Sequence, residues 1–393
     1  MTDRNEDPLA PLLSEATTAA FDLTFGPVRR WKEAVPGRKA AGCLPVYIPQ
    51  EVIRAAGMLP VGVFGGGDQL EIIRGDAYFQ SYICHIPRSI VELALSGRLG
   101  CLDAMIFPST CDVIRNLSGM WQMLLPGVVA RYLDLPQDRH PDIGGRFFRH
   151  ELRSIAADLS RLSGIEATDD SLREAIAAYN GNRRRLAALA RLRRKSPHLA
   201  PVSETFVLMR AGMVLPVEEF DRLLDRYLEL APGRARAEID NCRVVVRGTF
   251  CEQPPLGLLR TLERAGCDIV EDDLVLGAWW LRGDVREDGD PWEALSEAFL
   301  TQSVPTACMY PGDAPKGEDL VRTVRDTGAE GVIFAAPSFC DPALLDQPML
   351  ADALDRAGIP HTAFRYSEDT GQFQGIREQA GTFADSIKLW SER

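Results

Sequence analysis

Short apolar runs alternate along this chain with segments of helical periodicity. Five runs have the length and apolar character of buried strands: 59–64, 104–107, 244–246, 267–270 and 331–335. Helix-period segments at 50–57 and 256–264 are each closed by a nearby glycine and followed by one of these runs. A helix-closing glycine before an apolar run is typical of a βαβ unit. We therefore predict an α/β fold with two doubly wound, parallel-sheet domains.

The order of these patterns gives the predicted domain boundaries. Residues 1–40 are polar and helical, with interrupting prolines, and we interpret them as an N-terminal helical segment at a surface or interface. The first α/β domain is predicted at 41–165, a helical connector at 166–238 and the second α/β domain at 239–393.

The connector contains the clearest helix signals. Ser171 and Glu174 have capping-box spacing, and apolar residues then keep helical spacing as far as Leu192, with an interruption predicted at Gly181. A second helix is predicted at 217–230. The basic residues at 183–195 are interpreted as a solvated helix face, with an acidic partner as the alternative.

Composition narrows the class of protein. The 393 residues are long enough for two or three domains with real cores, and 46% apolar with 25% charged residues is a globular balance. A formal charge of -12 argues against a duplex nucleic-acid binder, because no basic face is available to neutralise phosphates. No apolar stretch or N-terminal pattern predicts a membrane span or a signal peptide, so we expect a cytoplasmic protein without a membrane partner.

A repeated cysteine motif is the main candidate for chemistry. Pro-Ser-Thr-Cys111-Asp and Pro-Ser-Phe-Cys340-Asp each follow a predicted strand, where ligands of open α/β sheets gather. Cys84 precedes a helix pattern at 89–99, and the helix dipole favours the thiolate form that binds metals. We predict that Cys84, Cys111 and Cys340 form a ligand set. Three thiolates without a fourth would leave one iron of an iron-sulfur cluster open to a small molecule, whereas four would favour electron transfer alone.

The remaining cysteines are interpreted as structural. Cys101, Cys242, Cys267 and Cys308 adjoin apolar runs and are expected in the core, while Cys43 and Cys251 lie in loops and are weighed against ligation. No Cys-x-x-Cys occurs, which excludes a zinc ribbon or a ferredoxin-type ligand loop. His85 is interpreted as a surface residue or, alternatively, as a hydrogen-bond or proton donor at the site. Asp112 and Asp341 are expected to cap helices through their side chains.

At this point the sequence resembles the family of 2-hydroxyacyl-CoA dehydratase and ATP-dependent (class I) benzoyl-CoA reductase subunits. The likeness covers nearly all of the chain beyond residue 40. It rests on the order and spacing of segment 49–57, Cys84 before a helix, Ser109-Thr110-Cys111-Asp112 with Arg115-Asn116, Asn180 within helix 172–185, and 339–342.

The resemblance implies two flavodoxin-like (Rossmann-like) domains that hold one [4Fe-4S] cluster through Cys84, Cys111 and Cys340. It implies a homologous cluster-bearing partner subunit, an acyl-CoA substrate and a separate ATP-hydrolysing activator, supplied indirectly by ferredoxin, that delivers low-potential electrons. The chain agrees, because it has no phosphate-loop motif of its own. Length and the segment around 282–289 favour the smaller of the two cluster-bearing subunits of a benzoyl-CoA reductase.

Three other functions stay open from sequence. The same scaffold serves 2-hydroxyacyl-CoA dehydratases, which remove water through a ketyl radical, and the choice between the two reactions depends on the pocket. A metal-holding assembly protein would use the thiolates for transfer. A solute-binding α/β protein would have structural cysteines alone.

Overall fold

The computed structural model describes residues 7–44, 46–250, 253–309, 315–367 and 373–391. Its strands form two four-stranded sheets in which every pairing is parallel. The first sheet has the order β2-β1-β3-β4 and the second has the order β6-β5-β7-β8. The bounds are Lys39–Cys43 (β1), Met58–Gly62 (β2), Ala104–Pro108 (β3), Val129–Leu133 (β4), Cys242–Arg247 (β5), Cys267–Asp272 (β6), Gly331–Pro337 (β7) and His361–Tyr366 (β8).

This strand order confirms the predicted doubly wound fold. In each sheet the chain starts on an inner strand, moves to one edge and then returns past the first strand, so the direction of winding switches between β1 and β3, and again between β5 and β7. A crevice opens at the carboxyl ends of the strands at such a switch point. Cys111 follows β3 and Cys340 follows β7, so the repeated motif lies at both switch points.

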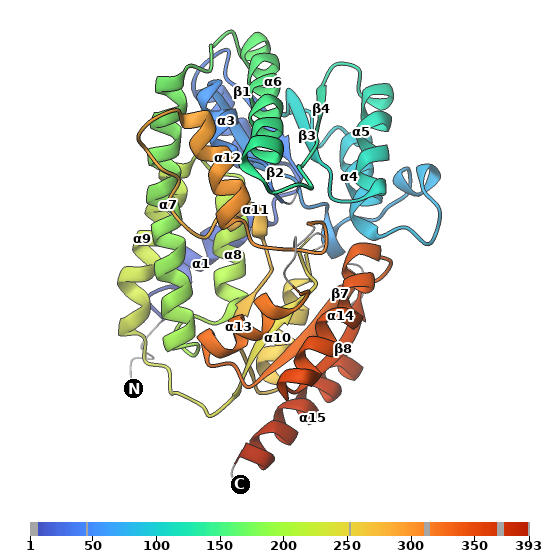
Figure 1. Ribbon diagram of the computed structural model, residues 1–393, viewed down its shortest axis with the longest axis vertical. Helices are drawn as coiled ribbons and strands as arrows, with labels where there is room; N and C mark the ends of the chain where they lie inside the picture. The colour runs from blue at the N-terminus through green and yellow to red at the C-terminus, as the bar shows by residue number, and fades with distance from the viewer. Residues whose placement is uncertain (1–6, 45, 251–252, 310–314, 368–372, 392–393) are drawn as a thin grey trace, which may run out of the picture.

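Helices cover both faces of each sheet (Figure 1). Their bounds are Ala10–Ala20 (α1), Gly26–Ala34 (α2), Gln50–Ala55 (α3), His85–Leu95 (α4), Asp112–Leu124 (α5), Arg146–Ser163 (α6), Asp169–Lys195 (α7), Val202–Gly212 (α8), Val217–Leu230 (α9), Leu256–Arg264 (α10), Leu276–Trp279 (α11), Pro291–Gln302 (α12), Glu318–Thr327 (α13), Asp341–Ala357 (α14) and Gln374–Ser391 (α15).

Successive side chains of the central strands belong to different buried clusters, one on each face of the sheet. Met105 and Phe107 of β3 pack with residues of α2, α4 and α5, whereas Ala104 and Ile106 pack with residues of α3, α6, α7 and α12. In β7, Ile333 and its neighbours on one face join a cluster with α8, α10 and α15, and the opposite face packs on α13 and α14. Successive side chains of a strand point to opposite faces, so both faces of these sheets must be apolar.

The two halves share part of this core. Ala336 and Cys340 of the second half belong to the same buried cluster as Ile106 and Phe148 of the first. Helix α7 runs along both halves and contacts α3 on one side and β6 on the other (Figure 1).

The connector differs from expectation in its details. The capping box is formed by Thr168 and Ser171, three residues earlier than predicted, because each side chain accepts the backbone N–H of the other at 3.1 and 3.0 Å. The helix runs without a break through Gly181. The second connector helix, α9, has the predicted bounds.

The prediction of a solvated basic face on this helix is partly wrong. Arg183 and Arg193 of α7 are buried and form ion pairs, both at 2.6 Å, with the buried carboxylates of Glu51 and Asp272. They link the connector to α3 in the first half and to β6 in the second.

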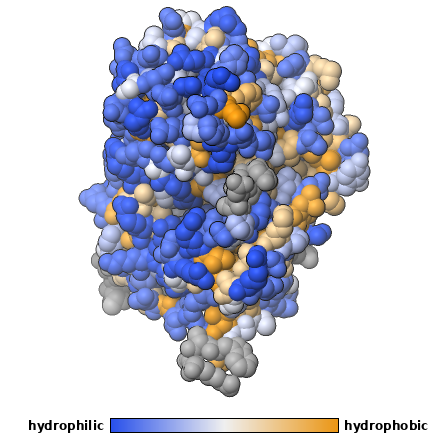
Figure 2. Space-filling view, in the orientation of Figure 1, coloured by the Kyte–Doolittle hydropathy of each residue, from blue (hydrophilic) through white to orange (hydrophobic). Residues whose placement is uncertain are grey.

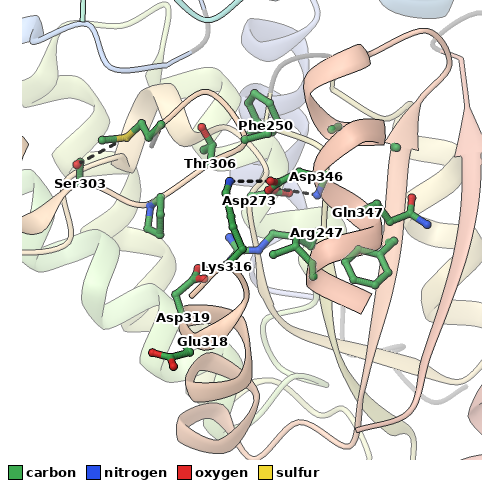
Figure 3. Close-up of a pocket in the computed structure, with 18 of the residues that line it drawn as sticks. Arg247, Phe250, Asp273, Ser303, Thr306, Lys316, Glu318, Asp319, Asp346 and Gln347 are labelled. Atoms are coloured by element: carbon green, nitrogen blue, oxygen red, sulfur yellow. Dashed lines mark hydrogen bonds and ion pairs between the residues drawn. The ribbon is translucent and has the colours of Figure 1, made fainter. Parts of the chain in front are cut away.

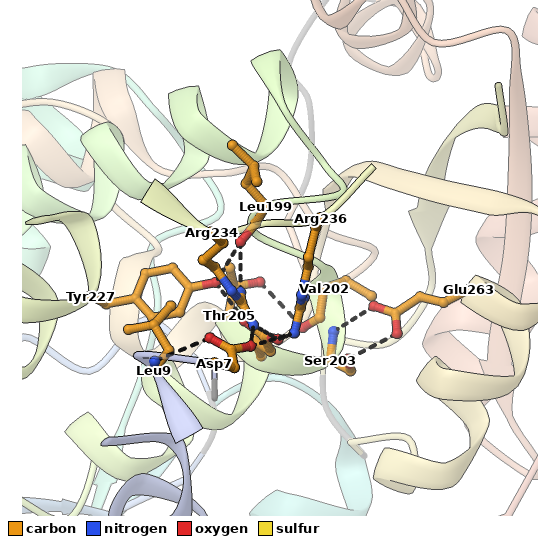
Figure 4. Close-up of polar contacts among 11 residues, drawn as sticks. Asp7, Leu9, Leu199, Val202, Ser203, Thr205, Tyr227, Arg234, Arg236 and Glu263 are labelled. Atoms are coloured by element: carbon orange, nitrogen blue, oxygen red, sulfur yellow. Dashed lines mark hydrogen bonds and ion pairs between the residues drawn. The ribbon is translucent and has the colours of Figure 1, made fainter. Parts of the chain in front are cut away.

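A further buried network holds the beginning of the described chain against the helical region. Arg234 is almost completely buried and pairs with Asp7 and Glu204, while the Tyr227 hydroxyl donates to Glu204 at 2.8 Å (Figure 4). Among the described residues, no helix is long and apolar enough to span a membrane.

Candidate cluster site

The three predicted ligand cysteines occupy equivalent positions, each immediately before a helix. Cys84 is the N-cap residue of α4, Cys111 of α5 and Cys340 of α14. Helix α4 begins at His85, four residues before the predicted start, which brings Cys84 to the helix terminus. None of these helices has a side-chain capping hydrogen bond. The usual N-cap residues are Ser, Thr, Asp and Asn, so three cysteines at these positions serve some purpose other than capping.

One backbone hydrogen bond repeats at the start of the Cys111 and Cys340 motifs. The N–H of Ser109 donates to the carbonyl of Leu133 at the end of β4, and the N–H of Ser338 donates to the carbonyl of Tyr366 at the end of β8. These bonds continue the parallel ladders for one residue beyond β3 and β7, and they fix the point at which each chain turns toward its helix.

Asp112 and Asp341 do not cap the helices, which corrects the expectation from sequence. Each is the first residue of its helix, one position after the N-cap cysteine. A carboxylate in the first turn interacts favourably with the helix dipole, but it stands one residue too late to cap the helix from the N-cap position.

The three cysteines line one cavity of about 700 Å³ between the two halves. The first half contributes the beginnings of α4 and α5, and the second half contributes the beginning of α14, which faces them in Figure 1. Side chains of Val46, Ile86 and Ile114 give the inner wall apolar character. The rim carries Phe339, Leu345 and Met349, which are 51%, 74% and 47% exposed. Figure 2 shows apolar residues gathered over α14, in contrast to the hydrophilic face over α7 and α9.

The electrostatics of this cavity disfavour bare thiolates. Burial raises the pKa of the Cys111 thiol to about 11, and negative charge on Cys308 or Cys340 would raise it further, against a lowering by the N–H groups of Ile114 and Val113. Without a nearby cation Cys111 therefore stays protonated at neutral pH. A metal centre bound to its sulfur would supply the missing positive charge.

Cys308 is the residue that sequence reasoning missed. It was expected in the core, but it is half-buried, lines the same cavity and interacts electrostatically with Cys111. The sequence did contain a signal for this position. Cys308 lies between Pro305 and the pair Pro311-Gly312, and such flanking residues are typical of a loop rather than a strand.

The other cysteines within the described chain are structural. Cys101, Cys242 and Cys267 are buried in the core as predicted, and Cys43 is 2% exposed at the end of β1. Burial raises the pKa of all four thiols. Cys251 lies outside the described residues. His85 is 6% exposed, so its interpretation as a surface residue was wrong; the first turn of α4 packs into the interior.

The donor set suits a cluster better than a single ion. Among the described residues, no three His, Cys, Asp or Glu side chains converge closely enough to hold one metal ion. The thiolates of a [4Fe-4S] cubane each bind a different iron, so they surround the cluster at wider separation. Thiolates from three loops around a cavity of this size fit such a group.

A second, smaller cavity of about 220 Å³ adjoins the first and lies at the carboxyl end of the second sheet (Figure 3). Ala307, Met309, Lys316 and Asp346 line both cavities. Lys316 and Asp346 pair at 2.6 Å, and Arg247 pairs with Asp319 at 3.1 Å. Two of its cationic groups are thus paired with carboxylates, which gives little excess charge for a free anion.

Comparisons with known proteins identify the family and several relatives of this chain. The profile of the 2-hydroxyglutaryl-CoA dehydratase, D-component family matches residues 45–387. The chain is 51% identical over 383 residues to a benzoyl-CoA reductase subunit of Thauera aromatica, the one designated C, covering 97% of this chain and 99% of that protein. It is 30% identical over 360 residues to the beta subunit of (R)-2-hydroxyglutaryl-CoA dehydratase of Acidaminococcus fermentans, covering 91% and 94%. It is 26% identical over 351 residues to the beta subunit of (R)-phenyllactyl-CoA dehydratase of Clostridium sporogenes, covering 89% and 92%. Because the profile matches most of its length, the chain belongs to the 2-hydroxyglutaryl-CoA dehydratase, D-component family.

Proposed function

We propose that this chain is the iron-sulfur subunit of an ATP-dependent benzoyl-CoA reductase, in which low-potential electrons reduce an aromatic acyl-CoA. The observation that carries the proposal is the 51% identity to a benzoyl-CoA reductase subunit over nearly the full length of both chains. The convergence of Cys84, Cys111 and Cys340 on one cavity supports it.

In this proposal the three N-cap cysteines hold one [4Fe-4S] cluster. When bound, the cluster supplies one-electron transfer at low potential. The protein contributes three helix N-termini whose dipoles favour the thiolate charge, and apolar walls that limit contact with water. Limited water access is a physical requirement, because a strongly reducing electron would otherwise be lost to protons.

The proposed partners follow from the sequence and from the chain's relatives. No phosphate-loop motif occurs in the sequence, so ATP hydrolysis belongs to a separate activator that ferredoxin reduces. The relatives are each named as one subunit of an enzyme, and we assign this chain a homologous cluster-bearing partner. Because thiolate ligands require a reducing compartment, we assign the complex to the cytoplasm.

The second candidate is a subunit of a 2-hydroxyacyl-CoA dehydratase. It is favoured by the family profile and by dehydratase beta subunits at 30% and 26% identity. Both reactions begin with an electron delivered toward an acyl thioester. They differ in the fate of the substrate: the reductase adds hydrogen to its substrate, and the dehydratase removes water from its substrate.

A product assay separates the two. The chain, its partner subunit and the activator are combined anaerobically with ATP, a reductant and either benzoyl-CoA or a 2-hydroxyacyl-CoA, and the thioesters are followed by mass. We expect the aromatic thioester to gain two hydrogens, from two electrons and two protons. Loss of water from the hydroxyacyl thioester, with the aromatic thioester unchanged, would overturn the reductase in favour of the dehydratase.

A further inference from the structure

The cavity between the two halves contains one thiol more than the predicted ligand set. Cys84 and Cys111 approach it from the first half, and Cys340 and Cys308 from the second. Cys308 does not belong to either repeated motif. It reaches the cavity on the loop that follows α12.

A buried hydrogen-bonded turn positions this loop. The Tyr47 hydroxyl of the first half donates to the Val304 carbonyl at 2.6 Å and also contacts the Thr306 Oγ1 at 2.9 Å. Thr306 Oγ1 accepts the N–H of Cys308 at 3.3 Å, and the Thr306 carbonyl accepts the N–H of Met309 at 3.0 Å. The position of Cys308 is therefore tied to the first half of the molecule, where Cys84 and Cys111 lie.

Tyr47 itself is firmly held. It is completely buried, and its ring packs edge-on against Trp280 and Phe299 with centroids 5.9 and 6.0 Å away. Its backbone has a φ of +64°, a left-handed conformation that costs a non-glycine residue on the order of 1 kcal/mol. Packing around the ring maintains this conformation, and the hydroxyl at its end fixes the turn that carries Cys308.

The other donors near the cavity are poorer ligands for iron-sulfur chemistry. Asp112 and Asp341 are exposed at the starts of their helices, and Lys316 is paired with Asp346. Carboxylate oxygens suit hard cations, whereas soft thiolates suit iron-sulfur clusters. A cubane has four irons, and four cysteine sulfurs line this one cavity.

We propose that Cys308 supplies a fourth thiolate, so that the cluster in this chain is fully ligated by protein. The inference rests on the proposed function, since it assumes a cluster held by Cys84, Cys111 and Cys340. On binding, the Cys308 thiol releases its proton to solvent as the sulfur binds the remaining iron.

The test uses the full chain, purified anaerobically with ⁵⁷Fe, as wild type, Cys308→Ala and Cys308→Ser. Wild type should contain about four irons per chain, all with sulfur-only Mössbauer parameters. Cys308→Ala should keep its irons but show one with a non-sulfur ligand, and added cyanide should change the EPR spectrum of its reduced cluster only. Cys308→Ser should give the same single altered iron. Cys101→Ala removes a buried thiol outside the cavity and serves as the matched control.

Two results would overturn the inference. One is a wild-type cluster that already has a distinct iron and responds to cyanide as the alanine variant does. The other is unchanged spectra in both Cys308 variants. If wild type binds no iron at all, the proposed function fails as well, and this separates the two failures.

Alkylation gives an independent readout. Cys308 is half-buried, so iodoacetamide should label it after iron is removed by a chelator but not in the loaded protein. Equal labelling of Cys308 before and after chelation, measured by peptide mass, would contradict ligation. Cys101, at 4% exposed, should stay unlabelled in both folded samples.

Discussion

At the scale of single residues, the N-cap cysteines allow ligand loss to be separated from loss of folding. A serine side chain at an N-cap accepts a hydrogen bond from a backbone N–H. This stabilises the protein by about 1 kcal/mol relative to a residue that makes no such bond. Replacing Cys84, Cys111 or Cys340 by serine should therefore leave helix stability unchanged or slightly higher, because none of the three caps its helix now.

The same substitutions should remove the cluster. We expect Cys84→Ser, Cys111→Ser and Cys340→Ser each to lose most of the bound iron and the visible absorption of the full chain. The denaturation midpoint of the iron-free protein should stay unchanged or rise slightly. Cys101→Ala is the control and should retain its iron. A serine variant with full iron and an unaltered spectrum would show that its cysteine is not a ligand.

Also at this scale, the sequence shows that segment 183–195 is basic, but it does not show which of its arginines are buried. Segment 183–195 has the composition of an exposed basic face, yet Arg183 is buried against Glu51 at 2.6 Å. Asn180 completes the contact by accepting from Arg183 at 2.6 Å and donating to the Val285 carbonyl at 2.8 Å. Partners so far apart in sequence can be recognised only after the chain has folded.

At the scale of elements, two glycines with opposite backbone requirements test how α6 and α7 are built. Gly181 lies inside α7, where an added methyl group would meet the flexible end of Arg185 at 3.3 Å. Gly164 ends α6 with a φ of +75°, and nothing lies within 4 Å of its missing Cβ. At Gly181 a substituted side chain has slightly too little space, whereas at Gly164 it has space but an unfavourable backbone conformation.

We expect Gly181→Ala to raise the free energy of unfolding by about 0.5 kcal/mol, since alanine favours a helix interior and Arg185 can shift. Gly164→Ala should lower it by about 1 kcal/mol, since only glycine adopts the left-handed conformation without cost. Urea denaturation of the full chain measures both. If both substitutions changed the free energy of unfolding in the same direction, a helical Gly181 and a left-handed Gly164 could not both be right.

At the scale of the whole molecule, the rim at the mouth of the cavity between the two halves exposes apolar surface that a partner protein could bury. Phe339, Leu345 and Met349 expose large apolar side chains there, and contiguous exposed apolar surface marks interaction sites. On α5, Trp121 belongs to the core, whereas Met123 is 77% exposed. We therefore expect the homologous subunit to cover the mouth.

Leu345→Glu should weaken association with the partner subunit at least about tenfold while leaving the iron content of the chain unchanged, because it puts a charge into an apolar contact. Ile239→Glu is the control: it is 65% exposed and precedes β5, at the amino end of the second sheet and away from the cavity. Co-elution with the partner on gel filtration measures association. Equal binding by wild type and Leu345→Glu would exclude the mouth as the interface.

The sequence by itself determined the α/β class, the parallel strands, the family and the three candidate ligands, because these depend on local periodicity and on a motif repeated after two strands. The domain boundaries and the ligand assignment stay predictions. Tertiary structure decided what depends on distant partners: the unbroken α7, the burial of His85, and the ion pairs of Arg183 and Arg193. It also brought Cys308 to the cavity, since a turn anchored by Tyr47 joins segments 259 residues apart. Local pattern cannot encode such a contact, because the chain must fold before either residue has a neighbour.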